Sequence, residues 1–347
     1  MTSNQAVNDL IAEAGGTGAP DAAGGSGHGA HAETLANVRD LARRIALSLG
    51  RVLNGKADAI ESVITTVLAG GHVLLEDVPG VGKTTLATAL AKSIDASVRR
   101  IQFTSDMLPT DITGLSIYDQ DRHEFQFHPG PIFTNILIGD EVNRATPKTQ
   151  SALLEAMGEQ SVTVDGVTHG LPELFTVIAT QNPQDMEGTF PLPEAQRDRF
   201  MTRISLGYPD AAAEAAMLKM RGASEPVRAV TPVATVAEVV AARRIVSAVH
   251  LSDEAADYMV AVVTGTRSHA ALALGGSPRA TLHLASMARA RAALRGRDFV
   301  SPDDVAALAA TVLPHRLTPK GRFSGIGEAH QAAANVVAEI VARTPVP

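Results

Sequence analysis

The sequence predicts an α/β fold with a parallel β-sheet, followed by a smaller helical domain. Between residues 57 and 206, short apolar strands alternate with amphipathic helices. This alternation is typical of a parallel sheet that helices cover on both faces. After Pro209 the chain becomes rich in alanine, with helical patterns and almost no strand signal. We therefore place a domain boundary near residue 208 and expect an all-helical lid over residues 209–347.

The N-terminal residues are expected to lie outside the folded core. Residues 13–32 are dominated by glycine and alanine, which bury little apolar surface and so favour disorder. We expect a disordered tail over residues 1–34. The first folded domain then covers residues 35–208 and begins with a basic amphipathic helix.

Length and composition exclude several classes of protein. The chain has 347 residues, 45% hydrophobic residues, a net charge of −7 and no cysteine. It is long enough for one large domain or two ordinary ones, and its acidic balance disfavours a general nucleic-acid binder. No apolar run is long enough to span a membrane, and the N-terminus does not have the pattern of a secretory signal. We therefore expect a cytoplasmic protein.

Apolar runs and turn residues assign the elements of the first domain in order. The expected strands cover residues 72–78, 98–103, 133–141, 174–182 and 201–206. The expected helices cover residues 57–71, 84–94, 146–157 and 192–200. Thr146 and Pro147 form the start of one of these helices, as N-cap and first helical residue. Two hairpins are expected, at 115–127 and at 161–169, the second with Asp165-Gly166 at its turn.

A glycine-rich loop, EDVPGVGKTT at residues 76–85, joins the first expected strand to the next helix. It ends in Gly-Lys-Thr, as the phosphate-binding pattern G-x-x-x-x-G-K-[ST] requires, but Asp77 stands where the pattern begins with glycine. A strand before the loop and a helix after it are the required setting. We explain Asp77 as a residue that tolerates the left-handed backbone conformation and can bond its own backbone.

The loop is expected to hold the phosphates of a nucleotide. Unpaired amides at the helix N-terminus attract phosphate, and Gly80 and Gly82 allow the backbone to approach it closely. Lys83 can reach the β- and γ-phosphates, while the Thr84 hydroxyl can bind Mg²⁺. The predicted nucleotide-binding residues are Asp77, Val78, Pro79, Gly80, Val81, Gly82, Lys83, Thr84 and Thr85.

Two adjacent carboxylates end the strand expected at residues 133–141. Asp140 is predicted to hold Mg²⁺ together with Thr84, and Glu141 is predicted to orient and deprotonate an attacking water. The alternative is a pair of solvated carboxylates without a catalytic role. The neighbouring phosphate-binding loop disfavours that alternative.

Together these motifs resemble the MoxR family of AAA+ ATPases. The matching segments, in order, are GHVLLEDVPGVGKTTLA, FHPGPIFTNILIGDEVNRATPKTQSALLEAMGEQSVTVDG, IATQNPQDMEGTFPLPEAQRDRF and GGSPRA. The resemblance implies an ATPase core at 35–208, a helical AAA lid at 209–347, and ATP with Mg²⁺ as cofactors. It also implies a homo-oligomer, expected to be a hexameric ring. The implied role is chaperone-like remodelling or metal-cofactor loading of partner proteins, commonly with a von Willebrand factor A-domain protein.

The resemblance assigns three further residues. Asn182 corresponds to sensor 1, whose amide can hydrogen-bond the γ-phosphate or the attacking water. Arg199 corresponds to the arginine finger, which acts on nucleotide held by the next subunit, with Arg197 as an alternative. Arg279 corresponds to sensor 2, which reaches back from the lid to the γ-phosphate. For Asn143 and Arg144 the resemblance implies an intersubunit or nucleotide-sensing role, and a salt bridge inside the core is an equal alternative.

The resemblance also implies that both hairpins project towards a ring pore. Tyr118, Phe125 and Phe127 are candidate contacts for a client protein, and packing within the core is an equal alternative for each of them.

Two other functions stay open. One is a nucleic-acid-acting motor of the same branch, which the acidic pI near 5.9 and the lack of a basic-aromatic cluster disfavour. The other is a regulatory module that binds ATP without useful turnover. No guanine-reading N-K-x-D motif follows the loop, which argues against a GTPase switch.

Overall fold

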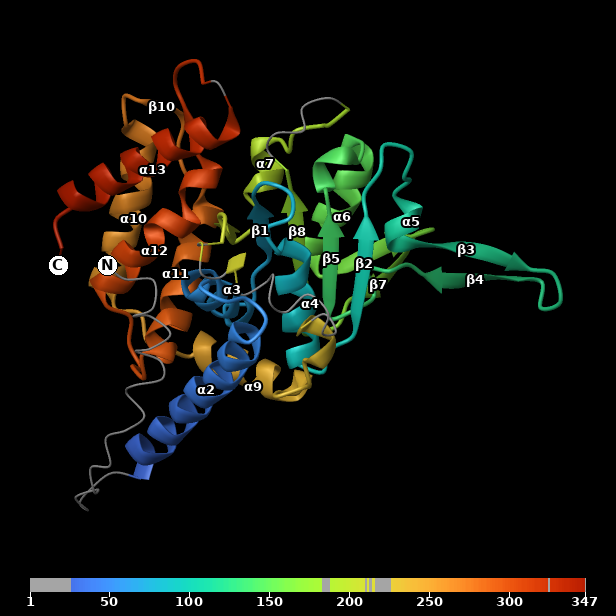
Figure 1. The fold of residues 1–347 in the computed structure, drawn as a ribbon, viewed down its shortest axis with the longest axis horizontal. Coiled ribbons are helices and arrows are strands. Elements are labelled where there is room, and N and C mark those ends of the chain that lie inside the picture. Colours follow the sequence, from blue (N-terminus) through green and yellow to red (C-terminus); the bar gives the residue numbers. More distant parts are fainter. Residues whose placement is uncertain are drawn as a thin grey trace.

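The computed structural model describes residues 26–182, 188–209, 211, 214–215, 226–323 and 325–346. Its centre is a five-stranded parallel sheet with the order β2-β5-β8-β1-β9 (Figure 1). The strands are β1 Val73–Glu76, β2 Val98–Gln102, β5 Ile136–Asp140, β8 Thr176–Gln181 and β9 Thr202–Ile204. The predicted parallel sheet is confirmed, and the strand carrying the glycine-rich loop lies inside it.

Both faces of the sheet are covered, because alternate residues of each strand point to opposite sides. Val73 and Leu75 of β1 pack into a cluster with α3, α4 and the lid, whereas Leu74 between them packs into a second cluster with α6. The helices of this domain are α3 Ala57–Leu68, α4 Lys83–Ser93, α5 Thr110–Thr113, 3₁₀ helix η2 Val142–Arg144, α6 Pro147–Glu159 and α7 Glu194–Arg197.

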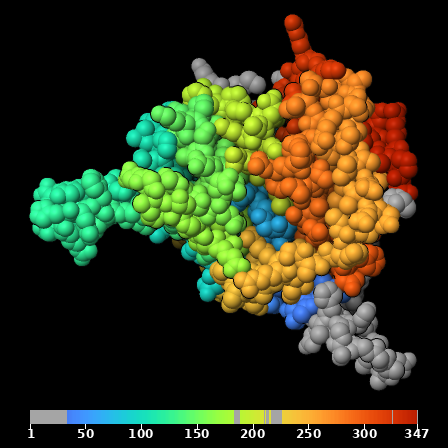
Figure 2. Space-filling view, turned by 180° about the vertical axis from the view of Figure 1, so that it is seen from behind, coloured from blue at the N-terminus to red at the C-terminus, as the bar shows by residue number. Residues whose placement is uncertain are grey.

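Both predicted hairpins are present. They are β3 Gly114–Asp119 with β4 Glu124–Pro129, and β6 Ser161–Val164 with β7 Val167–Gly170. The β3–β4 hairpin projects from the body as an arm (Figures 1 and 2). Phe127 stacks on His169 with ring centroids 4.0 Å apart, so this aromatic residue joins the two hairpins. Tyr118 and Phe125 remain 47% and 71% exposed.

The C-terminal part is helical, with one small sheet that the sequence did not predict. Strands β10 Leu272–Leu274 and β11 Thr318–Pro319 pair antiparallel, and such short strands leave no detectable periodicity. The helices are η3 Pro226–Ala229, α9 Val236–Ser247, α10 Asp253–Ser268, α11 Pro278–Leu294, α12 Pro302–Val312, η4 Pro314–Arg316 and α13 Ile326–Arg343.

Helix α2, Ser26–Gly50, precedes the sheet and contacts α3 and α4 as well as the lid helices α9 and α11 (Figure 1). It begins inside the segment 1–34 that was expected to be disordered. The helix therefore starts before residue 35, where the sequence predicts that the folded domain begins. Residues 1–25 lie outside the described residues. Among the helices that the structure describes, none is long and apolar enough to cross a membrane.

Candidate functional site

The glycine-rich loop turns directly from β1 into α4. Gly80 and Gly82 have φ values of 82° and 98°, in the region that favours glycine, and Gly82 is the N-cap of α4. The amino group of Lys83 donates hydrogen bonds to the backbone oxygens of Asp77 and Val78. Burial lowers the pKa of Lys83, although nearby carboxylates including Asp77 oppose this shift.

Asp77 is held by its side chain and not by an unusual backbone. Its φ is not positive, so the explanation through a left-handed conformation is wrong. The bond to its own backbone is present, because the Val78 amide donates to Oδ1 at 2.8 Å. Ser205 Oγ and the Gly207 amide donate to Oδ2 at 2.8 and 2.5 Å. Burial raises the pKa of Asp77, but the donors from Gly207, Ser205 and Val78 outweigh it and lower the pKa overall.

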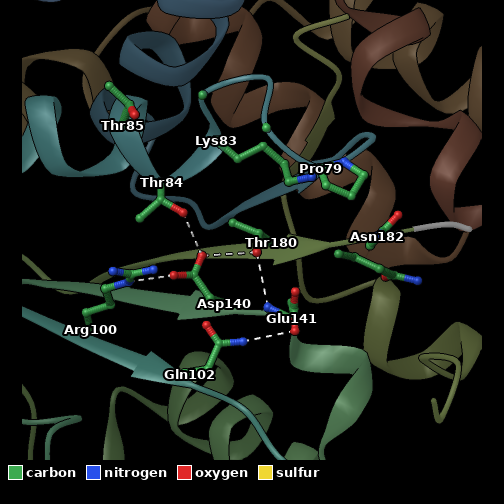
Figure 3. A pocket seen from close by; sticks show the side chains of 13 residues that line it. Pro79, Lys83, Thr84, Thr85, Arg100, Gln102, Asp140, Glu141, Thr180 and Asn182 are labelled. Atoms are coloured by element: carbon green, nitrogen blue, oxygen red, sulfur yellow. Dashed lines mark hydrogen bonds and ion pairs between the residues drawn. The ribbon is translucent and has the colours of Figure 1, made fainter. Parts of the chain in front are cut away.

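A cavity of about 310 Å³ opens between this loop and the carboxyl ends of β2, β5 and β8 (Figure 3). Its lining residues are Pro79, Gly80, Gly82, Lys83, Thr84, Thr85, Arg100, Gln102, Asp140, Glu141, Thr180, Gln181 and Asn182. The structure thus brings most of the predicted loop together with the acidic pair and Asn182. Asp77, Val78 and Val81 of the predicted set lie outside this lining.

Asp140 is oriented by three donors from three different elements. Thr84 Oγ1 and Thr180 Oγ1 donate to its Oδ1 at 3.0 and 3.1 Å, and Arg100 Nε donates to its Oδ2 at 2.6 Å (Figure 3). The hydroxyl of Thr84 and the carboxylate of Asp140 are hard oxygen ligands of the kind that suits Mg²⁺. Within the described residues there is no group of three His, Cys, Asp or Glu side chains arranged for a metal. Independently of that, one hydroxyl and one carboxylate fit Mg²⁺, which is usually bound through one or two carboxylates together with phosphates and water.

Glu141 is fixed at the mouth of the cavity by backbone and side chain. Its φ is 56°, a left-handed conformation that is uncommon for a residue with a side chain. Its amide donates to Thr180 Oγ1 at 3.1 Å. Gln102 Nε2 and Arg144 Nε contact its Oε2 at 3.0 and 2.9 Å. Of the two readings left open for Arg144, the structure contains the salt bridge.

Asn182 follows the last residue of β8 and lines the cavity near Pro79 of the glycine-rich loop (Figure 3). It is 7% exposed, and its backbone oxygen accepts a hydrogen bond from Asn143 Nδ2 at 3.4 Å. An amide in this position can contact both a terminal phosphate and a water held by Glu141.

The three predicted arginines lie outside this cavity. Arg199 donates to the backbone oxygen of Leu154 in α6 at 2.7 Å. Arg279 lies 3.7 Å from Asp198 Oδ2, at the junction of the core and the lid. The Nε of Arg197 is buried and has no hydrogen-bond partner among the described residues, while its guanidinium lies 4.0 Å from Oε1 of Glu194. Burial also lowers the pKa of Arg197.

Arg100, Gln102 and Thr180 were missed from the sequence. Arg100 and Gln102 are two apart on β2, so they share one side of the strand. The sequence shows this spacing, but the role of the two residues depends on β2 lying beside β5, which the sequence does not reveal. Thr180 lies two residues before Asn182 and could have been found by the same spacing rule.

The strand order, the glycine-rich loop after a central strand and the acidic pair on its neighbour define a P-loop ATPase of the AAA class with a helical lid. The model of the ATPase family associated with various cellular activities (AAA) matches residues 72–202, and that of the AAA lid domain matches residues 264–338.

The chain belongs to the MoxR family of AAA+ ATPases. It is 40% identical to Chaperone MoxR1 of Mycobacterium tuberculosis, covering 82% of this chain and 78% of that protein. It is 32% identical to Protein MoxR of Methylorubrum extorquens, covering 82% and 89%. A Bacillus subtilis protein without a characterised function, YeaC, is 49% identical over 86% and 92%.

A solved protein of Cytophaga hutchinsonii that is provisionally described as an ATPase has a similar fold. The TM-score is 0.82 and the sequence identity 33%, covering 93% of this chain and 100% of that one.

Proposed function

We propose that this chain hydrolyses ATP in the cavity between the glycine-rich loop and the ends of β5 and β8. The observation that carries the proposal is the meeting of Thr84, Asp140 and Glu141 at one edge of the sheet, with Thr84 Oγ1 3.0 Å from Asp140 Oδ1. A hydroxyl and two carboxylates beside a helix N-terminus match the needs of phosphate binding and water activation.

Each residue has a defined part in this reaction. Lys83 and the first amides of α4 bind the phosphates. Thr84 and Asp140 would hold Mg²⁺, which when bound neutralises charge that develops on the phosphates. Glu141 accepts a proton from a water while the water oxygen bonds to the γ-phosphorus and the bond to ADP breaks. Asn182 orients that water or the γ-phosphate.

The position of Arg199 supports a shared site. It lies outside the cavity of its own chain and is half-buried against α6. We take Arg199 and not Arg197 as the finger because the family resemblance assigns Arg199, and because the Nε of Arg197 is buried. We infer that the chain forms a ring, which the family resemblance makes a hexamer, and that Arg199 acts on nucleotide held by the next subunit. Arg279 would reach the nucleotide after a movement of the lid.

The cellular role that we propose is chaperone-like remodelling of a partner protein. The relative named Chaperone MoxR1 supports this role. The projecting β3–β4 hairpin supports it as well, because Tyr118 and Phe125 are exposed on it. Metal-cofactor loading and a von Willebrand factor A-domain partner belong to the same proposal and rest on the family resemblance.

Phosphate release and binding of a fluorescent ATP analogue test the proposal against its two rivals. We expect the purified chain to turn over ATP, a Lys83→Ala variant to lose binding, and Lys92→Ala, in the same helix, to behave like the unchanged chain. Binding without turnover in the assembled protein would instead indicate a regulatory module. Turnover that rises several-fold with DNA or RNA would indicate a nucleic-acid motor.

A further inference from the structure

Lys56 holds the segment between the core and the lid through hydrogen bonds. We call residues Ser205–Tyr208, which follow β9, the linker. Lys56, the last residue before α3, donates from its amino group to the backbone oxygens of Leu206, Gly207 and Tyr208, at 2.5, 3.2 and 2.9 Å. An ammonium group has three donors, and here three successive carbonyls satisfy them.

The linker has the backbone conformation that this contact needs. In an extended chain, successive carbonyls point to opposite sides, so three of them cannot meet one cation. Gly207 has a φ of 62°, in the left-handed region, and this residue turns the carbonyls to one side. A Cβ built at Gly207 would meet nothing within 4 Å. Glycine is therefore favoured at position 207 by the backbone conformation and not by a lack of space for a side chain.

Asp77, in the glycine-rich loop, accepts hydrogen bonds from the same linker. Its Oδ2 accepts from the Gly207 amide at 2.5 Å and from Ser205 Oγ at 2.8 Å. The amide of Gly207 thus contacts an anion, while its carbonyl contacts the cation of Lys56. Hydrogen bonds to charged groups are stronger than those between neutral groups.

Asp77 also contacts the residue that we expect to bind phosphate. The amino group of Lys83 donates to the backbone oxygen of Asp77. A phosphate that draws Lys83 forward would remove this contact and change the position of Asp77, whose carboxylate holds the linker. On the other side, α3 continues from Lys56 to Glu61, which lies 3.5 Å from Arg295 beyond the end of lid helix α11.

We propose that Lys56 and Asp77 are positioning residues that clamp the linker and pass nucleotide occupancy of the loop to the lid. This inference rests on the proposed ATP site, because it takes the movement of Lys83 as its input. The clamp makes the lid follow the state of the loop without requiring Arg279 to contact the nucleotide first.

The chain has no cysteine, so spin labels attach only at cysteines that are introduced, and a pair of them reports the distance between core and lid. Glu155→Cys in α6 and Asp257→Cys in α10 place one label on the core and one on the lid, both at exposed residues. Labelled chains are diluted with unlabelled ones, and the distance distribution is measured with and without a non-hydrolysable ATP analogue. The test variants are Lys56→Gln and Asp77→Asn. The matched control is Lys92→Gln, because Lys92 also donates to a backbone oxygen, that of Val227.

We expect the nucleotide to shift the distance in the unchanged chain and in the control. In both test variants the shift in distance should fall to about half or less, because each variant weakens the hydrogen bonds of one of the two residues that hold the linker. Turnover in Lys56→Gln should fall about tenfold, as expected for loss of a charged hydrogen-bond network, with little change in KM. A purely structural role would lower stability without separating kcat from KM.

Gly207→Ala provides a second route to the same answer if a charge variant fails to fold. It strains the linker through its positive φ and leaves both charges in place. A full shift in both Lys56→Gln and Gly207→Ala would overturn the clamp, as would the absence of any shift in the unchanged chain that binds nucleotide. Failure of the unchanged chain to bind nucleotide would instead overturn the proposed function.

Discussion

Gln102 donates a hydrogen bond to the carboxylate of Glu141 at 3.0 Å, from the strand next to the one that ends at the acidic pair. The contact holds Oε2 of the carboxylate of the proposed general base, and Arg144 contacts the same oxygen at 2.9 Å. The side chain that we propose to activate water is thus positioned in part by a residue from a different strand.

Replacing Gln102 should therefore affect the chemical step and not nucleotide binding. In Gln102→Ala we expect kcat to fall about five- to tenfold, the effect of losing about 1 kcal/mol of hydrogen bonding, with KM unchanged. Steady-state phosphate release measures both constants. Gln196→Ala, on α7 outside the cavity, is the matched control. An unchanged kcat in Gln102→Ala would mean that Arg144 alone positions Glu141.

We expect Arg100 to compete with Mg²⁺ for Asp140. Its Nε lies 2.6 Å from Asp140 Oδ2, but its side chain is 59% exposed, so solvent weakens the pair. In Arg100→Ala we expect half-maximal turnover at about threefold lower Mg²⁺, because a nearby positive charge is removed. Arg99→Ala changes a charge on the same strand and should leave the Mg²⁺ dependence unaltered. A higher Mg²⁺ requirement in Arg100→Ala would show that Arg100 assists the ion.

The stability of the fold should fall in mild acid. Burial lowers the pKa of both His72 and His330 to about 4, from 6.5, and the nearby Arg203 adds to the shift at His330. Between pH 6.5 and about 4 the unfolded chain binds protons at both residues while the folded protein does not, so falling pH favours unfolding. Each histidine contributes up to about 1.4 kcal/mol per pH unit in this window.

Urea unfolding at several pH values measures this dependence. His330→Gln should reduce the slope by the contribution of one histidine, because His72 remains, whereas His123→Gln, at an exposed residue of the β3–β4 hairpin, should leave the slope unchanged. Equal pH dependence in the unchanged chain and in His330→Gln would contradict the assignment.

A ring with shared sites predicts rescue between two inactive variants. Arg199→Ala keeps its own loop but supplies no finger, and Lys83→Ala does the reverse. Random mixing at equal amounts restores about a quarter of the interfaces in a head-to-tail ring, so turnover should return to about that fraction. Phosphate release from mixtures, compared with the separate variants, measures it. No recovery in mixed assemblies would count against action across subunits.

The site residues that belong to short local sequence patterns could be predicted from the sequence. Lys83 and Thr84 are fixed by a motif, and Asp140 and Glu141 by their place at a strand end, because parallel strands bring their carboxyl ends to one edge. Asn182 needed the family resemblance. The structure brings all five to one cavity.

The remaining contacts depend on which strands and segments become neighbours. Gln102 reaches Glu141 because β2 pairs with β5, and Lys56 reaches the linker across about 150 residues of chain. No local pattern encodes either contact. The bond of Asp77 to the neighbouring backbone was predicted correctly, but its partners Ser205 and Gly207 were missed because they are remote in sequence.

The central claim is that Glu141 activates water for ATP hydrolysis, and one comparison of rates tests it most directly. Glu141→Gln keeps the size of the side chain but removes the base, so we expect phosphate release to fall about 100-fold or more while ATP binding is kept. Glu155→Gln, an exposed residue of α6, is the matched control and should turn over ATP at the normal rate. Equal phosphate release from Glu141→Gln and the unchanged chain would contradict the account.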